Sequence, residues 1–167
     1  MIALRQDAAS EGGCYSWYFN LGDGTGIKVP KQQDEVDEEY ELYMKAQAAP
    51  FVPRCYSIVD VLLDGEKFRG IHLQHIDGIP LCQCNGMESD RYSLWLIVVR
   101  SLQKLCGITY HDQNPYNILV VLKRKMGSTT YTPSNNSRRS CQCQGGLITL
   151  EDIKMMYLID FTPGWAE

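Results

Sequence analysis

Two apolar, β-branched runs joined by an Asp-Gly pair constrain the fold of this chain more than any other feature. The runs cover residues 55–63 and 68–75, and Asp64-Gly65 lies between them. An Asp-Gly pair readily adopts the backbone conformations of a tight two-residue turn, so this region is predicted to be a β-hairpin. A second hairpin is predicted upstream, where Gly22-Asp23-Gly24 separates the aromatic-rich residues 15–20 from residues 26–29. The N-terminal half is therefore expected to form a small antiparallel sheet.

The apolar pattern changes to a helical period in two places. Between residues 34 and 49, five side chains fall on one side of a helical wheel, and Pro50 disfavours helix for the residue before it. These side chains are Val36, Tyr40, Tyr43, Met44 and Gln47. A second helix is predicted from about Glu88 to Cys106, with apolar neighbours so continuous that burial on most sides is expected.

Two further apolar strands are predicted after the second helix, at residues 118–122 and 155–159. The stretch between them is rich in Ser, Thr, Asn, Gln and Gly. A polar loop of that length inside a domain is usually functional or disordered, and we interpret residues 123–150 as a disordered insertion. The fold class expected from these elements is α+β, in one domain spanning residues 1–167.

Composition excludes several classes of protein. With 167 residues, 44% of them hydrophobic and 22% charged, the chain is typical of a globular domain that needs neither disulfides nor a structural metal. The longest apolar run, 94–99, is too short for a membrane span. A formal charge of −4 argues against nucleic acid as the main partner. Seven cysteines and no apolar leader at the N-terminus indicate a reducing, cytoplasmic environment.

The segment with the most chemical information is Tyr110-His111-Asp112-Gln113-Asn114-Pro115-Tyr116-Asn117, followed by an apolar strand. Asn117 lies five positions after Asp112, and Asp160-Phe161 follows the second apolar strand. This arrangement resembles the protein-kinase-like superfamily, which includes protein kinases and aminoglycoside phosphotransferases. The first segment is similar to the H-R-D-x-x-x-x-N catalytic loop, and Asp160-Phe161 is similar to the start of D-F-G.

The resemblance implies an ATP-dependent phosphotransferase that transfers the γ-phosphoryl group to a hydroxyl of a protein or small molecule. It makes Asp112 the catalytic base, and Asn117 and Asp160 the ligands of Mg²⁺. Such chemistry needs a carboxylate that accepts the hydrogen bond of the acceptor hydroxyl, and hard oxygen ligands that hold the metal against the phosphates. ATP and Mg²⁺ are the expected cofactors.

Two further residues complete the expected site. Residues 26–29 resemble the V-A-I-K strand, which makes Lys28 the phosphate-binding lysine; Lys31 follows Pro30 and is expected to start a loop. Helical geometry places Glu39 about 80° from the centre of the apolar stripe, closer than the neighbouring glutamates, so Glu39 is expected to pair with Lys28. Alternatively, Lys28 is an ordinary lysine at the edge of a strand, and Glu39 is an ordinary solvated acid on a helix.

The resemblance covers the front part of the family fold. It divides the chain into an N-lobe-like part, 1–80, with the helix that carries Glu39, and a partial C-lobe, 81–167, with the long helix and the catalytic-loop hairpin. Residues 75–81 resemble the hinge that binds adenine. Phe161 is followed by Thr162-Pro163 instead of glycine, no A-P-E follows, and the sequence ends seven residues after Asp160. These departures leave open a catalytically inactive nucleotide-binding or scaffold module, or a gene fragment. They leave the acceptor and the oligomeric state unspecified.

Overall fold

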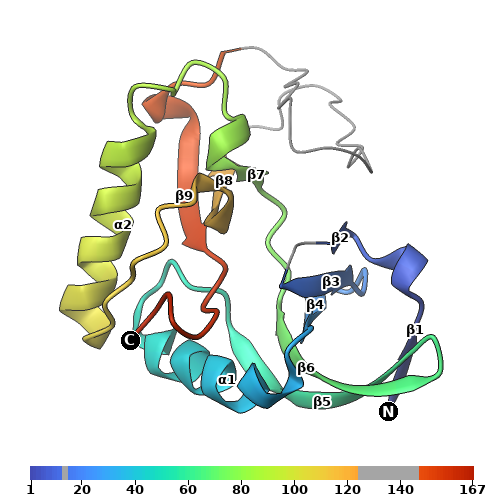
Figure 1. Cartoon of the computed structure of the whole chain (residues 1–167). Helices are drawn as coiled ribbons and strands as arrows, with labels where there is room; N and C mark the ends of the chain where they lie inside the picture. The colour runs from blue at the N-terminus through green and yellow to red at the C-terminus, as the bar shows by residue number, and fades with distance from the viewer. Residues whose placement is uncertain (13–14, 124–146) are drawn as a thin grey trace.

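The chain folds into two β-sheets and two α-helices in a computed structural model that describes residues 1–12, 15–123 and 147–167 (Figure 1). This architecture confirms the α+β class. The helices are α1 (Val36–Lys45) and α2 (Arg91–Cys106). The described strands are β1 (Ile2–Leu4), β2 (Glu11–Gly12), β3 (Ser16–Asn20), β4 (Thr25–Pro30), β5 (Cys55–Leu63), β6 (Glu66–Gln74), β7 (Ile79–Pro80), β8 (Ile118–Leu122) and β9 (Ile153–Leu158).

The larger sheet has six strands in the order β1-β5-β6-β4-β3-β2. Both predicted hairpins are confirmed, because β3 pairs antiparallel with β4 and β5 pairs antiparallel with β6. The β5–β6 turn uses the left-handed region of backbone space, with φ of 49° at Asp64 and 87° at Gly65. Sequence patterns did not predict β1, which pairs parallel with β5 at the edge of the sheet.

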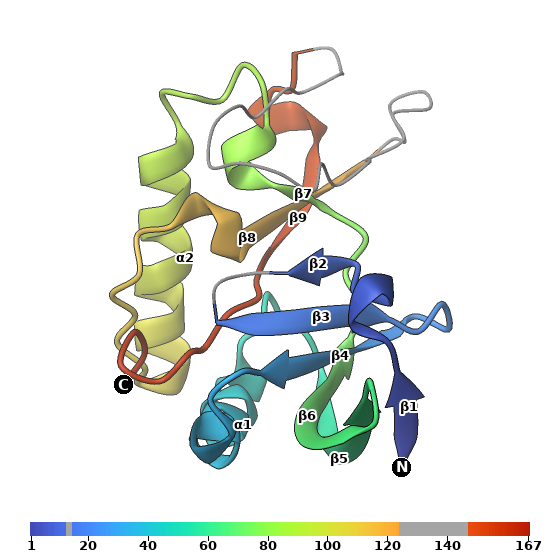
Figure 2. The ribbon, with the colours of Figure 1, turned by 45° about the vertical axis from the view of Figure 1, so that its right-hand side comes forward.

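The smaller sheet has the order β7-β8-β9, and residues 75–78 connect it to the larger one. Figures 1 and 2 show α2 beside β8 and β9. The predicted strands at 118–122 and 155–159 correspond to β8 and β9. Most of the insertion predicted at 123–150 lies outside the described residues. At its C-terminal end, Ile148 is buried and donates its backbone N–H to the Asn85 carbonyl.

The two helices bury different amounts of their surface. The α1 stripe is largely as predicted, with Val36 and Tyr43 fully buried, but Met44 lies on the outer side and is 45% exposed. The prediction that the second helix is buried on most sides is wrong. Leu94, Trp95, Val98 and Leu102 are buried, whereas Tyr92, Ile97 and Leu105 are half-exposed or more. Only one face of α2 packs against the rest of the described chain, so its outer apolar side chains face outward.

One hydrophobic core joins the two sheets. It contains Val36 and Tyr43 from α1, Ile71 and Leu73 from β6, and buried residues of α2, β8 and β9. A smaller cluster on the other face of the six-stranded sheet contains Phe19, Ile27, Val29, Val61 and Leu63. Within the described ranges, no helix combines the length and the apolar character that crossing a bilayer requires.

Candidate functional site

Lys28 lies in the middle of β4 and points away from the small hydrophobic cluster. Side chains alternate between the faces of a strand, so Ile27 and Val29 enter that cluster while Lys28 faces α1. The Lys28 ammonium group donates hydrogen bonds to the Glu39 carboxylate and to Asp160 Oδ1, the latter at 2.5 Å. These three residues, the ion triad, come from β4, α1 and the segment after β9.

Helix α1 presents Glu39 to Lys28 from its buried face. Glu39 is 2% exposed, and Val36 and Tyr43, three positions before and four after it, are fully buried on the same side. Glu38 and Glu41 are exposed. The geometric argument from the helical wheel therefore identified the glutamate that contacts Lys28. Lys31 is exposed, and its ammonium group lies 5.0 Å from the centre of the Trp17 ring.

Electrostatics in the ion triad favour a protonated lysine. Burial by itself would lower the pKa of Lys28, but the negative charges of Asp160 and Glu39 outweigh this and raise it above the usual range. Burial pushes the pKa of Asp160 up, yet the Lys28 charge and hydrogen bonds from Thr162 bring it below its ordinary value. The pKa of Glu39 is raised by burial, which Lys28 only partly offsets. The triad thus keeps Lys28 charged and Asp160 ionised at neutral pH.

Among the described residues, only one of the two carboxylate oxygens of Asp160 accepts hydrogen bonds. Its Oδ1 accepts from Lys28 and from the backbone N–H and hydroxyl of Thr162, at 3.1 and 2.8 Å. Within the described chain, Oδ2 accepts none. The Asp160 side chain is 27% exposed, which makes it more accessible than Lys28 or Glu39.

The loop between α2 and β8 holds Asp112 through both carboxylate oxygens. Oδ1 accepts from the Asn114 backbone N–H at 2.9 Å, and Oδ2 accepts from the Asn117 side-chain amide at 2.6 Å. Trp95 of α2 donates its indole N–H to the Asp112 carbonyl at 2.9 Å. Asp112 is partly exposed and Asn117 is buried. This loop and its three polar residues, Asp112, Asn114 and Asn117, are the second half of the site.

The two halves of the site meet at the end of the β8–β9 hairpin. The Ile159 backbone N–H donates to the Asn117 carbonyl at 3.0 Å, which brings Asp160 beside Asn117. Among the described residues, three polar or charged side chains are buried, and these are Lys28, Glu39 and Asn117. All three were selected from the sequence. The structure therefore gathers Lys28, Glu39, Asp112, Asn117 and Asp160 into one region.

Sequence reasoning missed several residues that support this region. Tyr43 donates its hydroxyl to the Ile159 carbonyl and packs edge-on against Phe161, with ring centres 4.8 Å apart. Tyr110 packs edge-on against the same ring at 6.1 Å. The Asp-x-Thr spacing of Asp160 and Thr162 is a local hydrogen-bonding pattern that the sequence displays. The tyrosine contacts are long-range and have no local signal.

The segment that resembles a hinge, 75–81, contains the link between β6 and β7 and then β7 itself. His75 follows β6, and its ring accepts or donates hydrogen bonds with the Tyr18 hydroxyl at 3.0 Å and the Asn20 amide at 3.1 Å. Ile79 and Pro80 form β7 and pair with β8. The Gly22–Gly24 segment forms the β3–β4 turn, as expected, with Asp23 Oδ1 accepting from Thr25.

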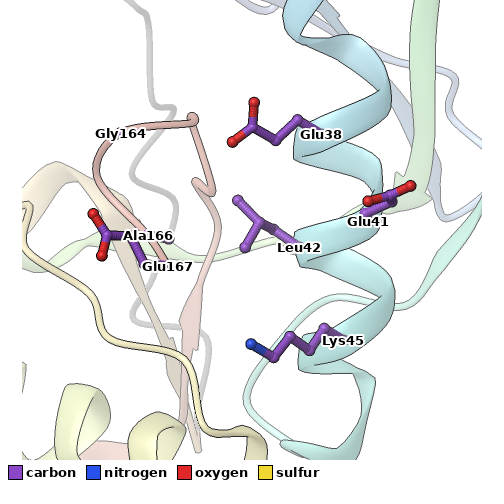
Figure 3. A pocket seen from close by; sticks show the side chains of 7 residues that line it. All are labelled: Glu38, Glu41, Leu42, Lys45, Gly164, Ala166 and Glu167. Carbon is purple, nitrogen blue, oxygen red and sulfur yellow. The ribbon is translucent and has the colours of Figure 1, made fainter.

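A cavity of about 420 Å³ lies beside α1, away from the ion triad. Figure 3 shows it between one side of α1 and the segment that ends the chain, with Leu42 pointing into the gap and Glu41 turned aside. Glu38, Lys45 and Gly164 also line it. None of the five predicted site residues borders this cavity. Apart from the partly buried Leu42 and the buried Ala166, its lining residues are exposed, so we place the candidate site at the buried hydrogen-bond network of the triad and the loop.

The described residues contain no cluster of the side chains that most often bind metals together. No group of three or more His, Cys, Asp or Glu side chains is placed there to hold a metal ion. Cys82 and Cys84 are buried, and the Cys84 thiol donates to the Pro80 carbonyl; Cys141 and Cys143 lie outside the described residues. No family model matches the chain, and no curated protein is significantly similar to it.

Proposed function

We propose that this chain is a kinase-like protein that binds ATP with Mg²⁺ and transfers the γ-phosphoryl group to a hydroxyl acceptor. The observation that carries the proposal is the buried ion triad, in which Lys28 contacts Glu39 and Asp160 from three separate parts of the chain. Burying charges costs free energy, and proteins often concentrate perturbed charges at functional sites. If this position bound no ligand and had no catalytic role, an apolar residue could be buried there at a smaller cost in free energy than a lysine.

Lys28 is suited to orient phosphate groups. Its pKa is raised, so it presents a full positive charge, and Glu39 fixes the position of its ammonium group from the buried side. Asp160 approaches Lys28 from the exposed side, so a phosphate would compete with Asp160 for part of its hydrogen bonding. In this arrangement, Glu39 is a positioning residue and Lys28 is the group that touches the nucleotide.

Asn117 and Asp160 fit a magnesium ion by their donor chemistry. Mg²⁺ prefers hard oxygen ligands and usually takes few from the protein, with water and phosphate supplying the rest. Asp160 Oδ2 and Asn117 Oδ1 accept no hydrogen bond from the described residues, whereas the other polar atom of each side chain is engaged. When bound, the ion would neutralise the charge that develops on the transferred phosphoryl group.

In this proposal, Asp112 is the base that receives the proton of the acceptor hydroxyl. In the transfer, the acceptor oxygen forms a bond to the γ-phosphorus, the bond to the β–γ bridging oxygen breaks, and ADP leaves. The acceptor proton passes to the Asp112 carboxylate, which is partly exposed. Two hydrogen bonds, from Asn114 and Asn117, hold this carboxylate in one orientation.

Titration calorimetry with MgATP, combined with an ATP hydrolysis assay on the same sample, tests the proposal. We expect binding that Lys28→Met weakens at least tenfold, together with hydrolysis above the protein-free rate. Glu38→Gln changes an exposed residue next to Glu39 and serves as the control. Binding without turnover would indicate the non-catalytic nucleotide-binding module instead. A folded protein that binds neither ATP nor ADP would refute both.

A further inference from the structure

The side chain of Asn117 presents a problem that a carboxylate would not. An amide has one oxygen and one nitrogen of similar shape, and only the oxygen can bind a cation. If the amide rotated by half a turn, the nitrogen with its two hydrogens would face the metal position. A site that uses an asparagine ligand therefore needs something that fixes the amide orientation.

Tyr110 supplies the second of two contacts to the Asn117 nitrogen. The Asn117 Nδ2 atom lies 3.1 Å from the Tyr110 hydroxyl and 2.6 Å from Asp112 Oδ2. The Asp112 carboxylate oxygen is the acceptor in this contact, which identifies the nitrogen end of the amide. The nitrogen carries two hydrogens, and the two acceptors use both of them. The amide oxygen is left without a hydrogen bond from the described residues.

The surroundings of Tyr110 hold its hydroxyl in place. Tyr110 is 2% exposed, its ring packs edge-on against Phe161, and its backbone forms an isolated bridge with Ala166. A hydroxyl held in this way is a suitable acceptor for one fixed amide hydrogen.

From this geometry we propose that Tyr110 is a positioning residue that locks the Asn117 amide with its oxygen toward Mg²⁺. This inference rests on the proposed function and adds a residue to it. Tyr110 occupies the position that the H-R-D pattern gives to histidine, and it does not touch nucleotide or metal. Its task is to make the metal affinity independent of amide rotation.

Tyr110→Phe tests the lock because it removes the hydroxyl and keeps the ring. We expect the Mg²⁺ concentration that half-saturates ATP binding to rise about three- to tenfold, the change that one lost hydrogen bond produces. ATP binding in EDTA is expected to change less than twofold. A purely structural role would weaken both kinds of binding together.

Tyr43→Phe is the matched control, because it also removes one buried hydroxyl beside Phe161. The Tyr43 hydroxyl bonds the Ile159 carbonyl and leaves Asn117 untouched. Its Mg²⁺ requirement is expected to stay within twofold of the wild-type value. If the half-saturating Mg²⁺ concentration rose equally in both variants, or did not change in Tyr110→Phe, the proposed role of Tyr110 would be refuted.

Hydrogen exchange of the Asn117 side-chain amide, followed by NMR in the absence of ligands, separates the lock from the proposed function. We expect exchange at least tenfold faster in Tyr110→Phe than in the wild type. If neither protein binds MgATP, the proposed function fails, and this measurement still decides whether Tyr110 holds the amide. Unchanged exchange in a folded Tyr110→Phe variant would refute the inference.

Discussion

The two halves of the candidate site are held by different kinds of contact. The ion triad joins residues that are 11 and 132 positions apart in sequence, and its lysine and glutamate are almost fully buried. The Asp112 carboxylate is held by hydrogen bonds that span two to five positions, and Asp112 itself is partly exposed, although the backbone of its loop also bonds Trp95, Ile159 and Trp165. The triad depends on the assembled fold, whereas the Asp112 side chain is oriented by neighbours in its own loop.

This difference separates what each half contributes. Charges that are buried together are strongly coupled to folding, because removal of one leaves the others without compensation. Groups in a short loop affect the fold less and are free to act on a ligand. Substitutions in the triad should therefore alter stability, and substitutions at Asp112 should alter chemistry.

The largest expected effect is on catalysis, from Asp112→Asn. Loss of a positioned base lowers turnover about 10²- to 10⁴-fold, which corresponds to about 2.7–5.5 kcal/mol. The free energy of unfolding is expected to change by less than about 1 kcal/mol, because the substitution keeps the side-chain shape and the backbone contacts of the loop. Turnover and the free energy of unfolding in urea, measured on the same preparation, check the two expectations. Unchanged turnover would remove Asp112 from the mechanism.

Lys28→Met should give the largest loss of stability. It leaves Glu39 and Asp160 facing each other without a cation, which costs about 3–5 kcal/mol in the free energy of unfolding. The variant should regain part of this loss as the pH falls, because protonation of either carboxylate relieves the repulsion. Urea denaturation at pH 7 and pH 5 measures both. A loss below 1 kcal/mol would contradict the strong coupling assigned to the triad.

Glu39→Gln and Glu38→Gln compare a buried and an exposed acid on the same helix. Glu39→Gln removes one of the two carboxylate charges beside Lys28 but keeps a polar side chain. We expect the free energy of unfolding to fall by about 1–3 kcal/mol. Glu38→Gln should stay within about 0.5 kcal/mol of the wild type. Chemical denaturation of the pair checks the assignment. Equal effects at both positions would mean that burial at position 39 does not decide its contribution.

The alkaline pH dependence of stability should report on Lys28. Its pKa is raised in the folded protein, so the stabilisation is fully present below the unfolded-state pKa of about 10.4 and is lost as the pH rises above it. The wild-type minus Lys28→Met difference in unfolding free energy should shrink there by up to about 1.4 kcal/mol per pH unit. Lys154 is exposed, and Lys154→Met is the control substitution, which should change the free energy of unfolding at neutral pH by less than about 0.5 kcal/mol.

The smallest effect is expected from Asn114→Ala. The Asn114 side chain accepts a hydrogen bond from the Tyr116 backbone N–H at 3.1 Å and caps the short 3-10 turn Pro115–Asn117. Removal of such a cap costs about 0.5–1 kcal/mol. Gln113→Ala, an exposed neighbour in the same loop, should cost less. Thermal unfolding of the two variants checks this, and a larger loss would show that the loop is tied to the core more tightly than its short-range contacts imply.

Local sequence patterns were sufficient for the elements whose partners are near in sequence. Both hairpins followed from their turn residues, and the orientation of Glu39 followed from the periodicity of α1. The sequence could not supply β1, whose parallel pairing with β5 spans more than 55 positions. The exposure of the α2 outer face was also missed, because a continuous apolar run does not show which of its sides has a partner.

The site shows the same limit. Asp112, Asn117 and Asp160 were selected from motif spacing, and the structure brings them into one region together with Lys28 and Glu39. The contacts of Tyr43 with Ile159 and of Tyr110 with Asn117 were not predicted, because they depend on tertiary packing. What the residues bind remains a proposal that the experiments above address.

The core that is shared by both sheets limits how the molecule can move. Buried residues of α1, β6, α2, β8 and β9 belong to a single cluster, and the Leu158 backbone N–H bonds the Phe51 carbonyl across it. A wide opening of one sheet away from the other would expose this cluster to water, at a large cost in free energy. A small molecule would therefore enter by side-chain rearrangement, and heating should melt the two parts as one cooperative unit.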